Sequence, residues 1–131
     1  MPQVGDIEAS ALVVRGLTEL KGESVAQIAT YIVAGAITEK SGVVALGSAG
    51  ALTMTLADPI EGTDDGKKLT IVAITAQAHK VSNVAGSGIN GGGGAVDFLN
   101  FAAAIGNSCI LVAHGGVWHA VNLLNVTIAG T

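Results

Sequence analysis

Residues 108–123 read "SCILVAHGGVWHAVNL", which is two runs of β-type residues separated by the pair Gly115-Gly116. Glycine adopts positive φ without steric cost, and a two-residue type I′ or II′ turn requires such residues. The stretch therefore predicts a β-hairpin with strands at 108–114 and 117–123. In that register Val112 lies opposite His119 and His114 lies opposite Val117, so the two imidazoles share one face of the hairpin.

Similar short runs extend back to about residue 31, separated by breakers such as "EKSG", "GSAG" and "DPIEGTDDG". This spacing is typical of an all-β sandwich or barrel. No fixed-period internal repeat is visible, and the strand order stays open between jelly roll, sandwich and another trimeric β fold. We expect a single sandwich or jelly-roll-like β domain over 31–131, with strands at 31–39, 42–46, 51–57, 68–76, 78–84, 95–101, 108–114, 117–123 and 125–129.

Residues 1–30 differ from the rest because they mix short apolar clusters with charges. Two readings stay open for this segment. "SVAQ" at 24–27 resembles a capping box and would open a short helix. Alternatively, 1–30 form an extended arm whose leucines and valines dock onto another protein.

The composition suggests assembly. Of the 131 residues, 50% are hydrophobic and only 12% are charged, and 98–131 contain no Lys, Arg, Asp or Glu. Soluble domains usually carry about 25% charged residues. An uncharged surface favours association, so we expect part of it to be buried in an oligomer. The net charge of −4 argues against nucleic-acid binding.

Targeting and redox signals are sparse. The single cysteine, Cys109, lies in the apolar run "CILVA" and is expected to be a buried hydrophobe. The start of the chain lacks the pattern of a signal peptide, and no apolar run approaches the ~20 residues of a membrane span. We therefore expect no membrane partner and assembly in a cytoplasm.

The glycine-rich stretch "GSGINGGGGAVDF", 86–98, contains a formal G-x-G-x-x-G. A dinucleotide site needs a helix after this motif and an acidic residue roughly 20 positions later. Here further glycines would fill the first helical turn, and no Asp or Glu follows Asp97. The expected alternative is a surface loop in which glycine meets positive φ or close backbone approach.

Other candidate sites have competing explanations. His114 and His119 would hold a metal only with a third ligand, so packed or interfacial histidines are expected. The acidic loop "DPIEGTDD", 58–65, lacks the EF-hand spacing and reads as a solvated hairpin tip. Trp118 is expected in a core or interface. The sequence predicts no enzyme, no cofactor and no metal.

The run "LTMTLADPIEGTDDGKKLTIVAITAQAHKVSNVAGSGING" resembles a segment of tailed-phage virion proteins, as do "GINGGGGA" and "LVAHGGVWHAV". The resemblance covers about 43–130 and is to head decoration, cement and head-fibre proteins; some tail fibres carry a similar β domain. The matching positions are Pro59, Gly62, Asp64, Asp65, Gly66, Lys67, Ala76, His79, Gly91 to Gly94 and Trp118.

The resemblance implies a homotrimer on the outer surface of a virion head, with the major capsid protein and other virion proteins as partners. Residues 1–30 would face the capsid, with Leu12, Val13, Arg15, Leu17 and Leu20 as contacts. The trimer interface would use Ile110, Val112, His114, Val117, His119 and Val121. The alternative function is a host-recognition module on a head or tail fibre that binds a cell-surface glycan through 85–95 or 58–66.

Overall fold

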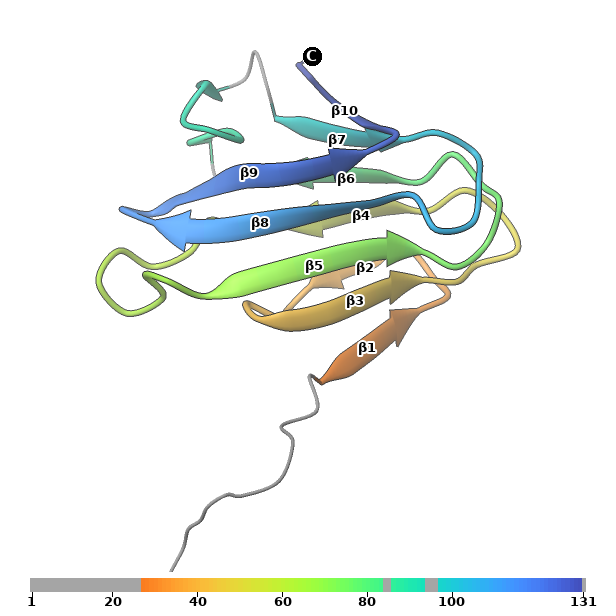
Figure 1. Cartoon of the computed structure of the whole chain (residues 1–131), viewed down its shortest axis with the longest axis horizontal. Helices are drawn as coiled ribbons and strands as arrows, with labels where there is room; N and C mark the ends of the chain where they lie inside the picture. The colour runs from red at the N-terminus through yellow and green to blue at the C-terminus, as the bar shows by residue number, and fades with distance from the viewer. Residues whose placement is uncertain (1–26, 84–85, 94–96, 131) are drawn as a thin grey trace, which may run out of the picture.

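The computed structural model describes residues 27–83, 86–93 and 97–130, and this part of the chain is all-β (Figure 1). The ten strands are β1 (Ile28–Tyr31), β2 (Gly35–Ile37), β3 (Gly42–Leu46), β4 (Thr53–Leu56), β5 (Lys68–Ala73), β6 (Lys80–Asn83), β7 (Phe98–Phe101), β8 (Ser108–His114), β9 (Val117–Leu124) and β10 (Val126–Ala129).

The strands form two five-stranded sheets packed face to face. Sheet A has the order β1-β3-β5-β8-β9, and sheet B has the order β10-β7-β6-β4-β2. Both sheets are mixed. β1, β3 and β5 are parallel, as are β2, β4 and β6, whereas the later strands pair antiparallel.

The first six strands wind as three successive coils, each of which passes from sheet A to sheet B. The coils differ in length because 57–67 form a long connection between β4 and β5. β7 and β8 then run back in the opposite direction, and β9 and β10 form a last coil with the direction of the first three. This winding is repetitive in space, but the unequal connections hide any period in the sequence.

The two ends of the sandwich carry different connections (Figure 1). At one end, the loop end, lie 38–41, 57–67, 86–93 and the turn 115–116. At the other, the arch end, 32–34, 47–52, 74–79, 102–107 and Asn125 carry the chain between the sheets.

The core lies between the sheets and follows the alternation of each strand. On β5 the buried residues are Leu69, Ile71 and Ala73. Because side chains of a strand point alternately to the two faces, one face of each sheet fills the core and the other faces outward. The central core residues are Trp118, Leu46, Met54, Leu56, Leu69, Ile71, Leu99 and Leu111.

The hairpin 108–123 is confirmed. Val112 pairs with His119 and His114 pairs with Val117, and Gly115 and Gly116 have φ of 62° and 78°, as a type I′ turn requires. A register shift between Ile110 and Leu111 leaves Val121 as the additional residue of a β-bulge on β9.

The fold class is confirmed as an all-β sandwich, whereas a barrel and a jelly roll do not describe it. A jelly roll is an antiparallel double sheet, and here parallel coils build more than half of the strands. The predicted strand 31–39 is wrong, because the chain crosses between the sheets at 32–34. The first strand begins at Ile28, inside the segment 1–30 that was predicted to be an arm.

Candidate assembly face and the loops beside it

The outer face of sheet A, face A, is largely apolar. Two of its rows across the sheet read Ile28-Val43-Thr70-Ile110-Asn122 and Thr30-Ala45-Val72-Ser108-Leu124. Its other residues are Lys68, Val112, His114, Val117, His119 and Val121, so Lys68 is its one Lys, Arg, Asp or Glu among the described residues.

The outer face of sheet B, face B, is mostly polar. Its two rows read Ala36-Thr55-Ser82-Phe98-Ala129 and Thr53-Lys80-Asn100-Thr127. Lys80 extends over the Phe98 ring with its Nζ 4.0 Å from the ring centroid, which shields that aromatic surface. The two faces of one sandwich therefore differ in chemistry, and face A is the one suited to burial against another protein.

The structure brings the six residues predicted for the trimer interface together on face A. All of them lie on β8 and β9 outside the core; His114 is exposed and Val121 has 60% of its surface exposed. Their role as a trimer interface stays a prediction. The predicted capsid contacts Leu12, Val13, Arg15, Leu17 and Leu20 lie outside the described residues, as does the predicted helix start at Ser24.

The predicted neighbourhood of the two histidines is confirmed. The His114 and His119 rings have centroids 6.3 Å apart and are tilted by 52°. Within 27–83, 86–93 and 97–130, no group of three His, Cys, Asp or Glu side chains is placed to hold a metal ion.

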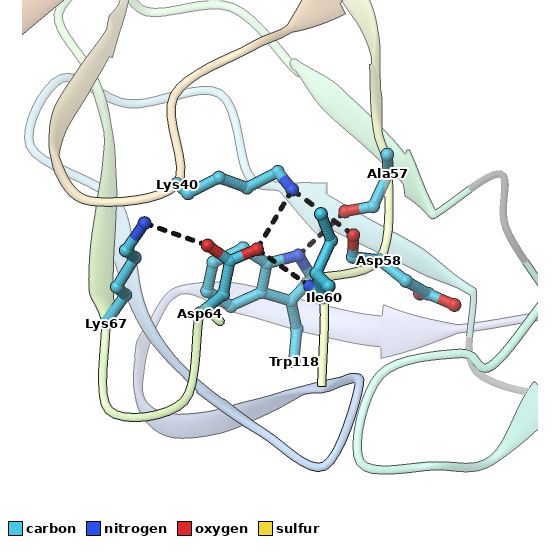
Figure 2. A network of polar contacts seen from close by, with 7 residues as sticks. All are labelled: Lys40, Ala57, Asp58, Ile60, Asp64, Lys67 and Trp118. Carbon is cyan, nitrogen blue, oxygen red and sulfur yellow. Dashed lines mark hydrogen bonds and ion pairs between the residues drawn. The ribbon is translucent and has the colours of Figure 1, made fainter. Parts of the chain in front are cut away.

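Asp64 organises the loop end (Figure 2). Asp64 is 3% exposed, and its carboxylate accepts hydrogen bonds from the Ile60 N–H at 2.7 Å, Lys67 Nζ at 2.8 Å and Lys40 Nζ at 3.3 Å. The Ile60 hydrogen bond, followed by the Lys67 ammonium, lowers the pKa of Asp64 to about 2. The predicted hairpin is wrong, because 57–67 connect strands of two different sheets. Most of the predicted tip 58–65 is exposed, as expected, but Asp64 is buried.

Trp118 also holds the loop 57–67, through a hydrogen bond from its indole. Its side chain is fully buried, and its Nε1–H donates to the Ala57 carbonyl at 2.9 Å, while Lys40 Nζ donates to the Asp58 carbonyl at 3.4 Å (Figure 2). The predicted core position of Trp118 is therefore confirmed, and its polar edge has a partner as buried indoles require.

The described part of the glycine-rich loop is held by hydrogen bonds. Asp58 Oδ1 accepts from Asn83 Nδ2 at 2.8 Å and from Ser87 Oγ at 2.5 Å, and Asn83 Oδ1 accepts from the Gly88 N–H at 3.0 Å. A Cβ on Gly88, whose φ is +74°, would lie 2.3 Å from the Gly93 nitrogen. Close backbone approach thus explains that glycine, as predicted.

The glycine-rich stretch was predicted to be a surface loop, but part of it is buried. Ile89 is 1% exposed and belongs to the core, where it bridges to Trp118. Asn90 donates its N–H to the Trp118 carbonyl and accepts from the Ala120 N–H through its Oδ1. Residues 89–90 therefore cover the free edge of β9 over 118–120.

A neutral histidine organises the arch end. His79 is 1% exposed; its Nδ1 accepts from the Leu52 N–H at 3.0 Å, and its Nε2 lies 3.0 Å from Thr75 Oγ1. Thr75 Oγ1 gives its one hydrogen to the Ser48 carbonyl at 2.6 Å, so Nε2 carries the proton that bonds Thr75. Burial lowers the pKa of His79, which favours this neutral form.

Cys109 is buried, as predicted, and burial raises the pKa of its thiol to about 12. Sequence reasoning missed Lys40, Asn83 and Ser87, because their partners are 24 to 29 residues away in the chain. The motif "GxDDGK" pointed at the correct loop, but nothing local indicated that Asp64 is buried and Asp65 is exposed.

Comparison with known proteins gives no relative. No family model matches the chain, and neither the curated proteins nor the solved structures include a match. The described residues form no helix that is long and apolar enough to cross a membrane.

Proposed function

We propose that this chain is a structural virion protein, a trimeric decoration or cement protein that binds the outer surface of a tailed-phage head. The observation that carries the proposal is face A, an apolar sheet surface with one lysine. The resemblance of 43–130 to virion proteins supplies the biological setting. Copies of the chain and the major capsid protein are the proposed partners.

The chemistry of face A supports an assembly role. Apolar surface removed from water contributes roughly 25 cal/mol per Å², and a β-sheet face offers it as a flat, rigid area. Ile110, Val72 and Val43 lie on neighbouring strands and are each partly exposed in the single chain. Burial of this area between copies would stabilise a trimer without any charged contact.

The mechanical role would be attachment at several points. A trimer presents three copies of every capsid contact, and linked contacts raise one another's effective concentration. Weak single contacts then give firm attachment, which opposes the outward pressure of packaged DNA.

A second candidate function is host recognition by a fibre, and one observation favours it. The two segments named as its glycan sites, 58–66 and the described 86–93, meet at the loop end through the Asp58–Ser87 hydrogen bond. They would form one composite surface. A glycan array in which the purified chain binds no glycan would count against this function.

The copy number of the chain in purified virions, measured by quantitative mass spectrometry against the major capsid protein, tests the proposal. Hundreds of copies per particle support a decoration protein. A handful of copies supports a fibre, and absence from virions contradicts both.

The proposed capsid-facing segment needs a separate test, and the start of β1 limits how far a deletion can extend without removing part of the sandwich. Because β1 begins at Ile28, deletion of 1–30 would remove most of an edge strand, whereas deletion of 1–26 leaves it intact. The shorter deletion is expected to abolish head binding and to keep the trimer. A deletion variant that binds heads as well as the full chain would reject the predicted contacts.

A further inference from the structure

The first coil of the sandwich leaves apolar side chains exposed. Ile28, Ile32 and Val33, on β1 and the following turn, have 67%, 65% and 69% of their surface exposed. β1 pairs only with β3, and β2 only with β4, among the described residues. One end of the stack of strands is thus uncovered in the described chain.

The last coil, at the opposite end of the stack, has the same property. Val121, Leu123 and Leu124 on β9 are 60%, 39% and 53% exposed. Residues 89–90 cover the outer edge of β9 over 118–120, but along 121–124 the edge of β9 that faces away from β8 pairs with no described segment. The uncovered stretch has about the length of β1.

Both coils lack the usual protection of edge strands. Natural edge strands are blocked by charged residues, prolines or bulges. β1, β2, β9 and β10 contain no Lys, Arg, Asp, Glu or Pro, and the bulge at Val121 is the only such device among them. Exposed, uncharged edges of this kind pair readily with another chain.

The directions of the edge strands match. β9 is antiparallel to β8, and β8 is antiparallel to β5, so β9 runs in the direction of β5, β3 and β1. By the same reasoning β10 runs in the direction of β2. A second copy placed in line would therefore continue both sheets with parallel pairs, which these sheets already contain.

We propose that copies of this chain join head to tail, with β9 and β10 of one copy paired in parallel with β1 and β2 of the next. Extending the rows of the two sheets across the contact gives the proposed register. Thr30 shares a row with Leu124, and Ala29 shares one with Leu123. In sheet B, Ile128 shares a row with Gly35. A Cβ built on Gly35 would have no atom within 4 Å, so there is room at this position for a side chain of the next copy.

The contact deepens the proposed self-association but does not depend on the virion role. A head-to-tail contact is heterologous, so it forms a ring if the rotation closes and a filament if it does not. Pairing in both sheets at once favours the filament, because two sheets ~10 Å apart with equal numbers of strands cannot both close into one ring. A ring of three that curves toward sheet A would keep the β9–β1 pairing, enclose face A and leave the polar face B outside.

Complementation between two blocked variants tests the proposal on the full chain. Thr30→Glu places a charge on the β1 edge, and Leu124→Glu places one in the same row on the β9 edge; both side chains are exposed, so the single chain should fold. Thr53→Glu, on an exposed position of an inner strand in face B, is the matched control. The mass of each protein is measured by sedimentation, alone and in mixtures.

The expected result is an oligomer for wild type and Thr53→Glu, a monomer for each blocked variant, and a dimer when the two are mixed. The dimer forms because the intact β9 edge of the Thr30→Glu variant can pair with the intact β1 edge of the Leu124→Glu variant. A monomeric wild type overturns the proposal. A Thr30→Glu variant with the mass of wild type also overturns it, and this result is expected if 1–26 of the same chain occupy the β1 edge. Blocked variants that stay monomeric on mixing indicate a symmetric contact and also overturn it.

Virion copy number and complementation can fail independently. A chain absent from virions that still complements would reject the virion role alone. A chain abundant in virions that does not complement would reject the head-to-tail contact alone.

Discussion

Face A and face B belong to sheets of five strands in the same sandwich, yet they present different chemistry. Ile110 on face A lies in a row with Val43 and Thr70, whereas Ser82 on face B lies in a row with Thr55 and Phe98. The inner faces of both sheets contribute apolar residues to one shared core. The core therefore cannot explain the apolar character of face A, and a partner can.

The largest expected effect comes from removing the residue on which the sandwich itself depends. Trp118→Ala should destabilise the fold by about 3–5 kcal/mol, because it empties the volume of a fully buried indole. Urea unfolding of the purified protein measures this. Trp118→Phe is the matched control and should cost less, since it keeps a ring and loses mainly the hydrogen bond to Ala57. Equal losses in the two variants would contradict the packing role.

The next effect concerns the loop end. Asp64→Asn should lower Tm clearly more than Asp65→Asn, because only Asp64 pairs with Lys40 and Lys67. The pKa of Asp64 in the folded protein is about 2, below the 3.8 of an ordinary aspartate. The charge therefore stabilises the fold above pH 3.8, and this contribution is lost as pH falls toward 2. Thermal unfolding of both variants at pH 7 and at low pH measures the difference. Identical melting of the two variants at pH 7 would show that the buried network contributes nothing.

A smaller effect on stability is expected at His79 in the arch end, where stability changes over a higher pH range than it does for Asp64. The folded pKa of His79 is lowered, so the unfolded chain binds more protons and stability falls as pH decreases below 6.5. His79→Gln should lose part of this slope, while it should be less stable than wild type at pH 8 because the bonds to Leu52 and Thr75 change. Urea midpoints between pH 8 and pH 5 provide the test. An unchanged slope in the variant would mean that His79 is not held neutral.

The smallest effect is expected on face B. Ser82→Glu should change the free energy of unfolding by less than about 1 kcal/mol, since the side chain is outward on a polar face. Urea unfolding measures it. A markedly larger loss would indicate that face B is also buried in an assembly, which would remove the contrast between the faces.

Local features were predictable from the sequence. The 108–123 hairpin follows from Gly115-Gly116 and alternation, and the burial of Cys109 and Trp118 follows from their apolar runs. Strand 42–46 was also predicted correctly, because β-branched residues lie between clear breakers.

Non-local features were not predictable. Alternation shows that a run is a strand but does not show which sheet it joins. The sequence therefore does not reveal that β1, β3 and β5 are parallel neighbours in one sheet while β2, β4 and β6 lie in the other. The burial of Asp64 depends on Lys40, which local composition cannot reveal. The first three residues of β1 were assigned to the arm because they continue a segment that mixes apolar clusters with charges, whereas Tyr31 was predicted to open a strand.

The measurement that tests the central claim most directly is the solution mass of wild type, Ile110→Glu and Ser82→Glu by sedimentation equilibrium. Both substituted residues are partly exposed and lie in rows without Lys, Arg, Asp or Glu, so the added charge is matched. If face A is the assembly surface, wild type and Ser82→Glu are oligomers of equal mass and Ile110→Glu is a monomer. An Ile110→Glu protein with the mass of wild type, or a wild type that is itself a monomer, would contradict the account.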